Sequence, residues 1–269
     1  GSSATGTTAH VMGRHGNSID LNADYAELIV YNRVLTSIEM DTLLSYLSVK
    51  WGTSYTADAD ISPSLLGEST LVAFGDSITQ GTGETRSYRV TLADRLSVTV
   101  TNEGIGGTPL QNTNRVSPVS PAPNNGRDRY VVDTTGGAAK DIAVILYGTN
   151  DLGYAPQTNW TPALYGSDLE EVVDGLIADG YAANKIVICS PPYIEDYNFS
   201  ATFTGSNVTV HETYVAAARQ VAVDTGVLYA DTYAATKAVG SASVSTDGLH
   251  PNDVGHYIIA NTILKASSV

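Results

Sequence analysis

Three short motifs, far apart in the chain, carry side chains that can act together in acyl transfer. They hold a hydroxyl, an amide, and a carboxylate with an imidazole: Gly-Asp-Ser-Ile-Thr with Ser77, Gly-Thr-Asn-Asp with Asn150, and Asp-Gly-Leu-His-Pro with Asp247 and His250. A serine hydroxyl is a weak nucleophile unless a base takes its proton, and histidine titrates near neutral pH. The motifs therefore predict a nucleophile, an oxyanion donor and an acid–base pair.

Each motif by itself also has a simpler explanation. A serine directly after a strand, such as Ser77, is more often a helix cap than a nucleophile. We interpret Asp76 and Asp151 as structural hydrogen-bonding residues. Asp247 lies three residues before His250, so one tight turn can place both side chains on the same side. It is the joint presence of the motifs, in the order Ser, Asn, Asp, His, that favours catalysis.

The elements that must position these motifs alternate between strand and helix. Apolar runs predict strands at 71–75, 98–102, 142–147, 185–190 and 227–231, and periodic patterns predict helices near 86–97, 167–179, 208–225 and 252–265. Residues 108–140 are rich in Pro, Asn and Gly and are expected to form loops above the sheet. This alternation predicts a parallel sheet covered on both faces, with ligands bound beyond the carboxyl ends of its strands. The three motifs fall there.

Composition limits the classes of partner. The 269 residues carry a formal net charge of −14, which disfavours nucleic acid because phosphate contacts need clustered basic residues. No apolar run approaches about 18 residues, so no transmembrane helix is expected. The single cysteine, Cys189, lies in an apolar run and is interpreted as a buried strand residue. The acidic composition fits an extracellular protein of bacterial or phage-like source.

Residues 1–52 differ from the rest of the chain. A strand at 26–32 precedes a capping box, Thr36 to Glu39, and a helix that stops near Trp51. This stretch resembles the C-terminal end of laminin-G-like (concanavalin-type) β-sandwich domains. Residues 53–69 are small and polar, and they are predicted to be a linker.

Residues 70–269 resemble the SGNH (GDSL-type) hydrolase superfamily. The resemblance rests on the Ser77, Asn150 and Asp247–His250 motifs, together with the stretch Asn102–Gly107; Ile78 replaces the Leu that is common in the first motif. It implies a three-layer α/β/α fold with a parallel, flavodoxin-like five-stranded sheet. It also implies a catalytic Ser77, Asp247 and His250, and an oxyanion hole built by Ser77, Gly107 and Asn150. No cofactor or metal is implied.

Aromatic and histidine side chains outside the motifs have different expected roles. Tyr154, Trp160 and Tyr193 follow predicted strand ends or their loops and are candidates for the lining of a substrate pocket. His211 is expected to be solvated near the start of a helix. His256 is expected to be an ordinary residue of the last helix, because its spacing from His250 matches no usual zinc motif.

These observations predict a serine carboxylic ester hydrolase that acts through an acyl-enzyme. The favoured substrate is O-acetylated polysaccharide, because the laminin-G-like stretch suggests a modular protein acting on glycans. A short-chain esterase or lipase, a thioesterase and a transacylase use the same residues. A function of another class, a non-catalytic adhesion or phage-tail-like binding module, also remains open. The oligomeric state is not indicated.

Overall fold

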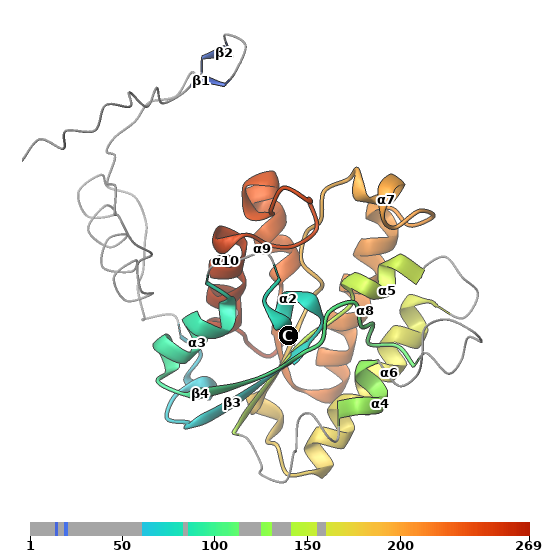
Figure 1. Ribbon diagram of the computed structural model, residues 1–269. Helices are drawn as coiled ribbons and strands as arrows, with labels where there is room; N and C mark the ends of the chain where they lie inside the picture. Colours follow the sequence, from blue (N-terminus) through green and yellow to red (C-terminus); the bar gives the residue numbers. More distant parts are fainter. Residues whose placement is uncertain are drawn as a thin grey trace, which may run out of the picture.

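Residues 14–15, 19–20, 61–82, 86–112, 125–130, 141–154 and 160–269 are described by the structure, a computed structural model (Figure 1). The predicted strand and helix at 26–52 and most of the loops at 108–140 lie outside these residues. Two short strands, β1 (Arg14–His15) and β2 (Ile19–Asp20), pair antiparallel near the amino terminus.

A five-stranded parallel sheet forms the centre of the fold, in the order β4-β3-β5-β6-β7. Its strands are β3 (Thr70–Gly75), β4 (Thr99–Gly104), β5 (Ile142–Leu146), β6 (Ile186–Cys189) and β7 (Leu228–Ala230). Strand β4 follows β3 in the chain but lies on the other side of β3 from β5, at the edge of the sheet. This order matches the predicted flavodoxin-like sheet. In this order the crevice for ligands opens between β3 and β5.

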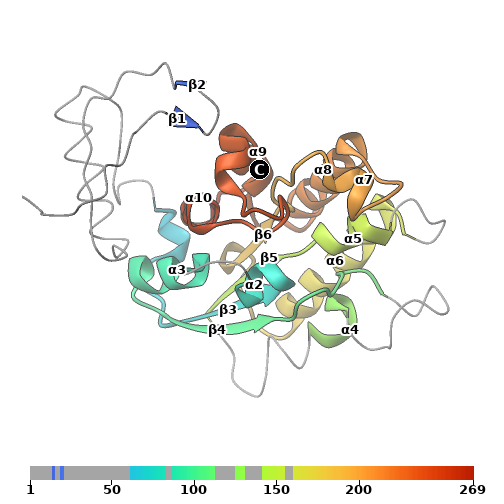
Figure 2. The same cartoon turned by 45° about the horizontal axis from the view of Figure 1, so that its top comes forward.

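Helices cover both faces of the sheet (Figures 1 and 2). They are α2 (Ser77–Gln80), α3 (Tyr88–Leu96), α4 (Gly126–Tyr130), α5 (Thr149–Tyr154), α6 (Pro162–Ala178), α7 (Asn198–Ala201), α8 (Val208–Thr225), α9 (Thr232–Val239) and α10 (Asp253–Leu264). The described residues also form the 3-10 turns η1 (Pro63–Leu65), η4 (Ala183–Lys185) and η5 (Gly240–Ser243). None of the helices in the described ranges is long and apolar enough to cross a membrane.

Two apolar clusters, one on each face, hold the three layers together. On β5, Ala143 and Ile145 face the cluster under α6 and α8, whereas Val144 and Leu146 face the cluster under α3 and α10. This alternation follows from the two-residue period of a strand. Because the strands are buried on both faces, their sequence reads as a continuous apolar run. Each fully buried Val, Leu or Ile contributes roughly 1.5–3 kcal/mol.

Several parts of this fold differ from the sequence-based expectation. The predicted linker 53–69 is folded onto the sheet layer from residue 61 onward: Leu65 is buried in the α3–α10 cluster, and Ser62 N–H donates to Leu264 O at 2.7 Å. Helix α6 begins at Pro162 rather than near 167, because Thr161 caps it by accepting from Leu164 N–H. Proline at the first helical position favours this start. Helix α9 was not predicted.

Two glycines let α2 lie directly against the ends of the central strands. A Cβ on Gly104 would overlap the backbone nitrogen of Gln80, and a Cβ on Gly75 would overlap the Thr79 hydroxyl. A larger residue at either position must therefore push α2, with Ser77 at its first position, away from the sheet. Gly166 in α6 is different, because an added Cβ would approach nothing closer than Val221 at 3.8 Å.

We predict that Gly104→Ala costs about 2–3 kcal/mol of stability through overpacking and also lowers esterase activity. The matched control, Gly166→Ala, is expected to stabilise the protein by roughly 0.5–1 kcal/mol because alanine favours the helix. Thermal unfolding and turnover of a p-nitrophenyl ester measure both effects. Equal stability and activity in Gly104→Ala and wild type would contradict the tight approach of α2.

His211 is buried, which corrects the expectation that it is solvated. Its Nε2 lies 3.1 Å from Pro191 O, and its ring packs between Phe199 and Tyr233. Burial lowers the pKa of His211 to about 4, against a smaller opposite effect of the hydrogen bond with Pro191. Between pH 6.5 and 4 the unfolded chain therefore binds a proton that the folded protein excludes, so stability rises with pH in this window.

We therefore expect His211 to lower the free energy of unfolding by up to about 3 kcal/mol as the pH falls from 6.5 to 4. His211→Gln keeps a donor for Pro191 O but cannot titrate, so the free energy of unfolding of the wild type should fall relative to that of the variant over this window. Denaturant unfolding of both proteins at several pH values gives the difference. Parallel curves for the two proteins would show that His211 does not have the lowered pKa.

Candidate active site

The hydroxyl of Ser77 is placed by the N-terminal turn of α2. Asp76 caps this helix, with its Oδ1 accepting from Ile78 N–H at 2.9 Å, as expected for a structural residue. Gly81 ends the helix in a left-handed conformation, with φ +99°. The short helix therefore holds Ser77, half-buried, at the carboxyl end of β3, which pairs with β5.

The Asp247–His250 turn brings an imidazole to this hydroxyl. His250 Nε2 lies 3.0 Å from Ser77 Oγ, and His250 Nδ1 lies 2.7 Å from Asp247 Oδ2. A ring that donates from Nδ1 to the carboxylate has Nε2 free to accept the serine proton. The three side chains form one hydrogen-bonded chain, as expected from the motif spacing.

The carboxylate of Asp247 is held by its own turn. Its Oδ1 accepts from the backbone N–H of Leu249 at 2.8 Å, from the backbone N–H of His250 at 2.9 Å, and from the Ser245 hydroxyl at 2.9 Å. Burial would raise the pKa of Asp247, but these bonds and the His250 ring outweigh it, so the pKa lies well below its usual range. Asp247 is therefore ionised at neutral pH, and it can stabilise a positive charge on His250.

Gly107 and Asn150 lie on the two segments that flank Ser77. Gly106 N–H donates to Gln80 Oε1 at 2.9 Å, and Asn150 Nδ2 donates to Thr108 O at 3.1 Å. These bonds hold Gly106 and Thr108, the residues on either side of Gly107. Gly107 itself has φ +76°, a conformation that favours glycine. The structure thus brings Ser77, Gly107 and Asn150 to one edge of the sheet.

Two buried carboxyl groups hold the segments that carry the site: Asp151 holds the loop with Gly107, and Asp76 holds the turn with Ser77. Asp151 accepts from Leu110 N–H at 2.9 Å and from Gln111 N–H at 3.0 Å, and it is completely buried. Burial raises the pKa of Asp151 to about 6, although these hydrogen bonds lower it. Burial likewise raises the pKa of Asp76 to about 7, against the hydrogen bond from Ile78 and aided by the charge of Asp151. Both residues have the structural role expected of them.

The three pocket candidates have different surroundings. Tyr193 is half-buried and its hydroxyl donates to Glu195 Oε2 at 3.0 Å. Trp160 is only 1% exposed, so it packs inside the protein instead of facing an open pocket. The side chain of Tyr154 lies outside the described residues. His256 belongs to α10, as expected, and its Nδ1 accepts from Tyr88 N–H at 3.3 Å.

Two site-forming residues were missed by sequence reasoning. Gln80 holds Gly106, and Arg129 donates to Gly75 O at 2.9 Å while its guanidinium lies 4.8 Å from the Phe74 ring centroid. Gln80 directly follows the Ser77 motif in the chain, and this position is the one sequence signal that could have indicated its role. Arg129 lies in a segment without a recognisable motif, and nothing in the sequence indicates its place.

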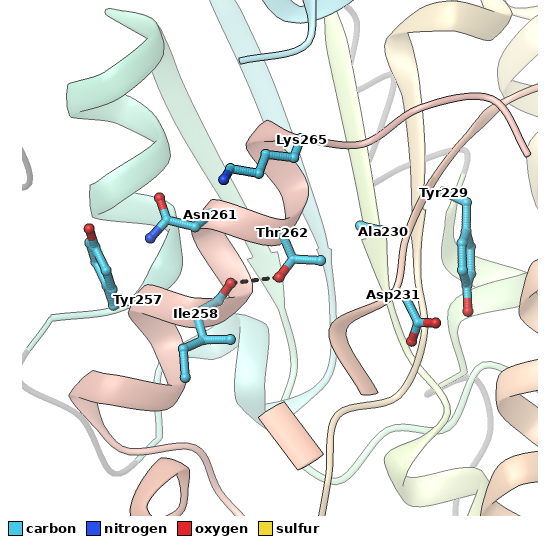
Figure 3. A pocket seen from close by; sticks show the side chains of 8 residues that line it. All are labelled: Tyr229, Ala230, Asp231, Tyr257, Ile258, Asn261, Thr262 and Lys265. Carbon is cyan, nitrogen blue, oxygen red and sulfur yellow. Dashed lines mark hydrogen bonds between the residues drawn. The ribbon is translucent and has the colours of Figure 1, made fainter. Parts of the chain in front are cut away.

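A separate surface pocket of about 330 Å³ lies between α10 and the end of β7 (Figure 3). Its lining mixes apolar and polar side chains: Tyr229, Ala230, Asp231, Tyr257, Ile258, Asn261, Thr262 and Lys265. None of these belongs to the Ser77 site. Asp231 is occupied as the cap of α9, where its Oδ1 accepts from Ala234 N–H at 2.9 Å.

Solved structures with the same fold include several hydrolases. A lipase/acylhydrolase from Enterococcus faecalis matches with a TM-score of 0.57 and 22% identity, over 75% of this chain and 98% of the other. A variant of an acetyl xylan esterase from Geobacillus stearothermophilus matches with a TM-score of 0.54 and 22% identity, over 74% and 94%. An alpha/beta hydrolase enzyme from the metagenome of Lake Arreo, Spain, gives 0.55 and 22%, over 74% and 94%.

No curated protein matches the chain. The model of the GDSL-like lipase/acylhydrolase family does match, over residues 73–258. This range includes the serine, asparagine and Asp–His motifs and all five strands of the parallel sheet except the first residues of β3. The chain therefore belongs to the GDSL-like lipase/acylhydrolase family and is a serine esterase of the SGNH type.

Proposed function

We propose that the protein removes O-acetyl groups from polysaccharide by way of an acyl-enzyme on Ser77. The observation that carries the proposal is the hydrogen-bonded chain from Asp247 through His250 to Ser77 Oγ, at 2.7 and 3.0 Å. Asn150 and Gly107 flank this serine. Ester hydrolysis itself follows from the family, whereas the glycan substrate and the roles of individual residues are the proposal.

In the proposed mechanism Ser77 Oγ attacks the ester carbonyl carbon while His250 Nε2 takes the hydroxyl proton. The N–H groups of Ser77 and Gly107 and the amide of Asn150 stabilise the oxyanion that forms. His250 then gives its proton to the departing alcohol oxygen, and the acyl group stays on Ser77. Water, deprotonated by His250, attacks this acyl-enzyme and releases the carboxylic acid.

Three observations support a glycan as the alcohol part of the substrate. The Asp247 side chain is 50% exposed and Ile105, beside Gly106 and Gly107, is 41% exposed, so the described rim of the site is open to a bulky substrate. One protein with the same fold is described as an acetyl xylan esterase. The resemblance of residues 1–52 to a laminin-G-like domain also fits a modular protein that acts on polysaccharide. Such a substrate would place the protein outside the cell.

Asn150→Ala tests the proposed oxyanion hole. Loss of one oxyanion donor is expected to lower kcat on the order of 10²–10³-fold. The KM should change much less, because the oxyanion exists only in the transition state. Steady-state kinetics with p-nitrophenyl acetate separate the two constants, and a kcat within about threefold of wild type would exclude Asn150 from this role.

The substrate is tested by measuring acetate release from acetylated xylan, and turnover of p-nitrophenyl esters and acyl thioesters of rising chain length. Wild type and Ser77→Ala are compared throughout. We expect serine-dependent acetate release and a strong preference for acetyl over longer acyl groups.

Other outcomes would overturn the proposal in distinct ways. Preference for long acyl chains would indicate a lipase-like enzyme, and preference for thioesters a thioesterase. Equal activity of both proteins would remove Ser77 from the mechanism. Absence of turnover across the whole panel would favour the binding-module function.

A further inference from the structure

The turn that carries Asp247 and His250 is attached to one neighbouring segment, residues 195–198, at the entrance to α7. Three consecutive carbonyl groups of the turn each accept a hydrogen bond from this segment. The bonds are Tyr197 hydroxyl to Thr246 O at 3.5 Å, Asn198 Nδ2 to Asp247 O at 3.1 Å, and Glu195 N–H to Gly248 O at 2.7 Å. The segment after β6 thus supports the loop between α9 and α10; α7, α9 and α10 are labelled in Figure 1.

The close approach of the two segments leaves the turn little room to shift. Gly248 has φ +65°, and a Cβ at this position would overlap the Tyr197 hydroxyl and lie 2.8 Å from Glu195 Cβ. Of the three donors, Glu195 uses a backbone N–H that no substitution other than proline removes. Tyr197 is half-exposed and its bond is long. Asn198 is therefore the side chain with the strongest hold on the turn.

Asn198 is fixed at both ends of its amide. It is 2% exposed, its Nδ2 donates to Asp247 O, and its Oδ1 accepts from the Thr202 hydroxyl at 3.0 Å. The carbonyl of Asp247 can only accept, so the amide must point its NH₂ group toward the turn. The side chain does not cap α7, since Tyr197 is the N-cap residue and makes no side-chain cap bond. Stabilisation of α7 thus does not explain the bond to Asp247.

The bond from Asn198 complements the bonds that Asp247 makes with its carboxylate. Asp247 Oδ1 holds the N–H groups of its own turn, and Oδ2 faces His250. These bonds fix the carboxylate relative to the turn, but they do not fix the turn relative to the sheet. The three bonds from residues 195–198 to main-chain oxygens do so, because α7 and its preceding loop follow β6, two strands from the strand that ends at Ser77. The bond from Asn198 is the one that acts on Asp247 itself.

We propose that Asn198 is a positioning residue that keeps Asp247, and through it His250, at hydrogen-bonding distance from Ser77. The inference rests on the proposed roles of Asp247, His250 and Ser77. Loss of the Asn198 donor would leave the buried side of the Asp247 carbonyl unpaired and would remove the middle of the three bonds that hold the turn, so Asp247 would be held less firmly. A displacement of about 1 Å at a reacting group can cost on the order of 10²-fold in rate.

The test compares Asn198→Ala and Asn198→Leu with Thr202→Val in assays with p-nitrophenyl acetate. Both Asn198 variants lack the donor to Asp247 O, and Asn198→Leu keeps the approximate size of the side chain should Asn198→Ala fold poorly. Thr202→Val removes the other partner of the Asn198 amide without touching the turn. We expect both Asn198 variants to lower kcat about 10–100-fold with KM within about threefold, and Thr202→Val to stay within about twofold of wild type.

A double-mutant cycle separates positioning from a general structural role. If Asn198 acts through Asp247, its replacement in an Asp247→Asn background should cost less than about threefold, because the residue that it positions has already lost its function. The same fold-loss in both backgrounds would overturn the inference. So would Asn198 variants with wild-type kcat, or a loss that Thr202→Val reproduces and that follows the melting temperature.

The same experiment distinguishes a failure of the proposed function from a failure of this inference. If Ser77→Ala and Asp247→Asn keep wild-type turnover, the proposed roles of these residues are wrong and the inference falls with them. If these two variants lose activity while both Asn198 variants keep theirs, only the role of Asn198 is wrong.

Discussion

The hydrogen bond between His250 Nε2 and Ser77 Oγ joins residues that are 173 positions apart. The packing of the sheet and its helices is what brings these two side chains together. A serine that is not deprotonated is a poor nucleophile, so the proposed chemistry requires both partners to stay in place. The contact exists because β3 and the loop before α10 end at the same edge of a parallel sheet. Such a sheet is stable only when helices cover both faces, and the two apolar clusters on either side of the strands provide this cover.

The nucleophile side of the site depends on close approach of main chains. Helix α2 lies against the ends of β3 and β4 because Gly75 and Gly104 have no side chain there. The segment with Gly107 is then held on α2 through Gln80, and on α5 through Asn150. The oxyanion donors that we propose are thus held by bonds that exist before any substrate binds, and such an arrangement needs no reorganisation in a transition state.

Burial of acidic groups is the energetic cost of this arrangement. Asp76 and Asp151 are both buried, and burial raises the pKa of Asp76 to about 7 and of Asp151 to about 6. Both carboxylates accept backbone N–H groups of the segments that carry the site, so their hydrogen bonds offset part of the desolvation. Asp247 is the opposite case: it is half-exposed, accepts several hydrogen bonds and stays ionised.

Local patterns in the sequence were sufficient for the strands and for the family. A strand buried on both faces must be apolar throughout, so the runs before Ser77 and Asn150 predicted β3 and β5 to within a residue or two. The start of α6 was misplaced because Asp168 resembles a residue of a first helical turn. In the structure Asp168 is buried instead and accepts from Asn112 N–H at 2.9 Å. The prediction that His211 is solvated was also wrong, because its partner, the carbonyl of Pro191, lies twenty positions away in the chain.

The sequence by itself determined the family, the order of the three motifs and the sheet edge at which they meet, because motif and strand are contiguous in the chain. Only the tertiary structure decided which side chains hold those motifs in place. Gln80, Arg129 and Asn198 contact backbone atoms 26, 54 and 49 positions away. Those partners are set by strand register and by helix packing across the sheet, which no local pattern encodes. The difference follows from the range of the forces: backbone preference and periodicity act over a few residues, whereas a hydrogen bond to a distant carbonyl exists only after the layers have packed.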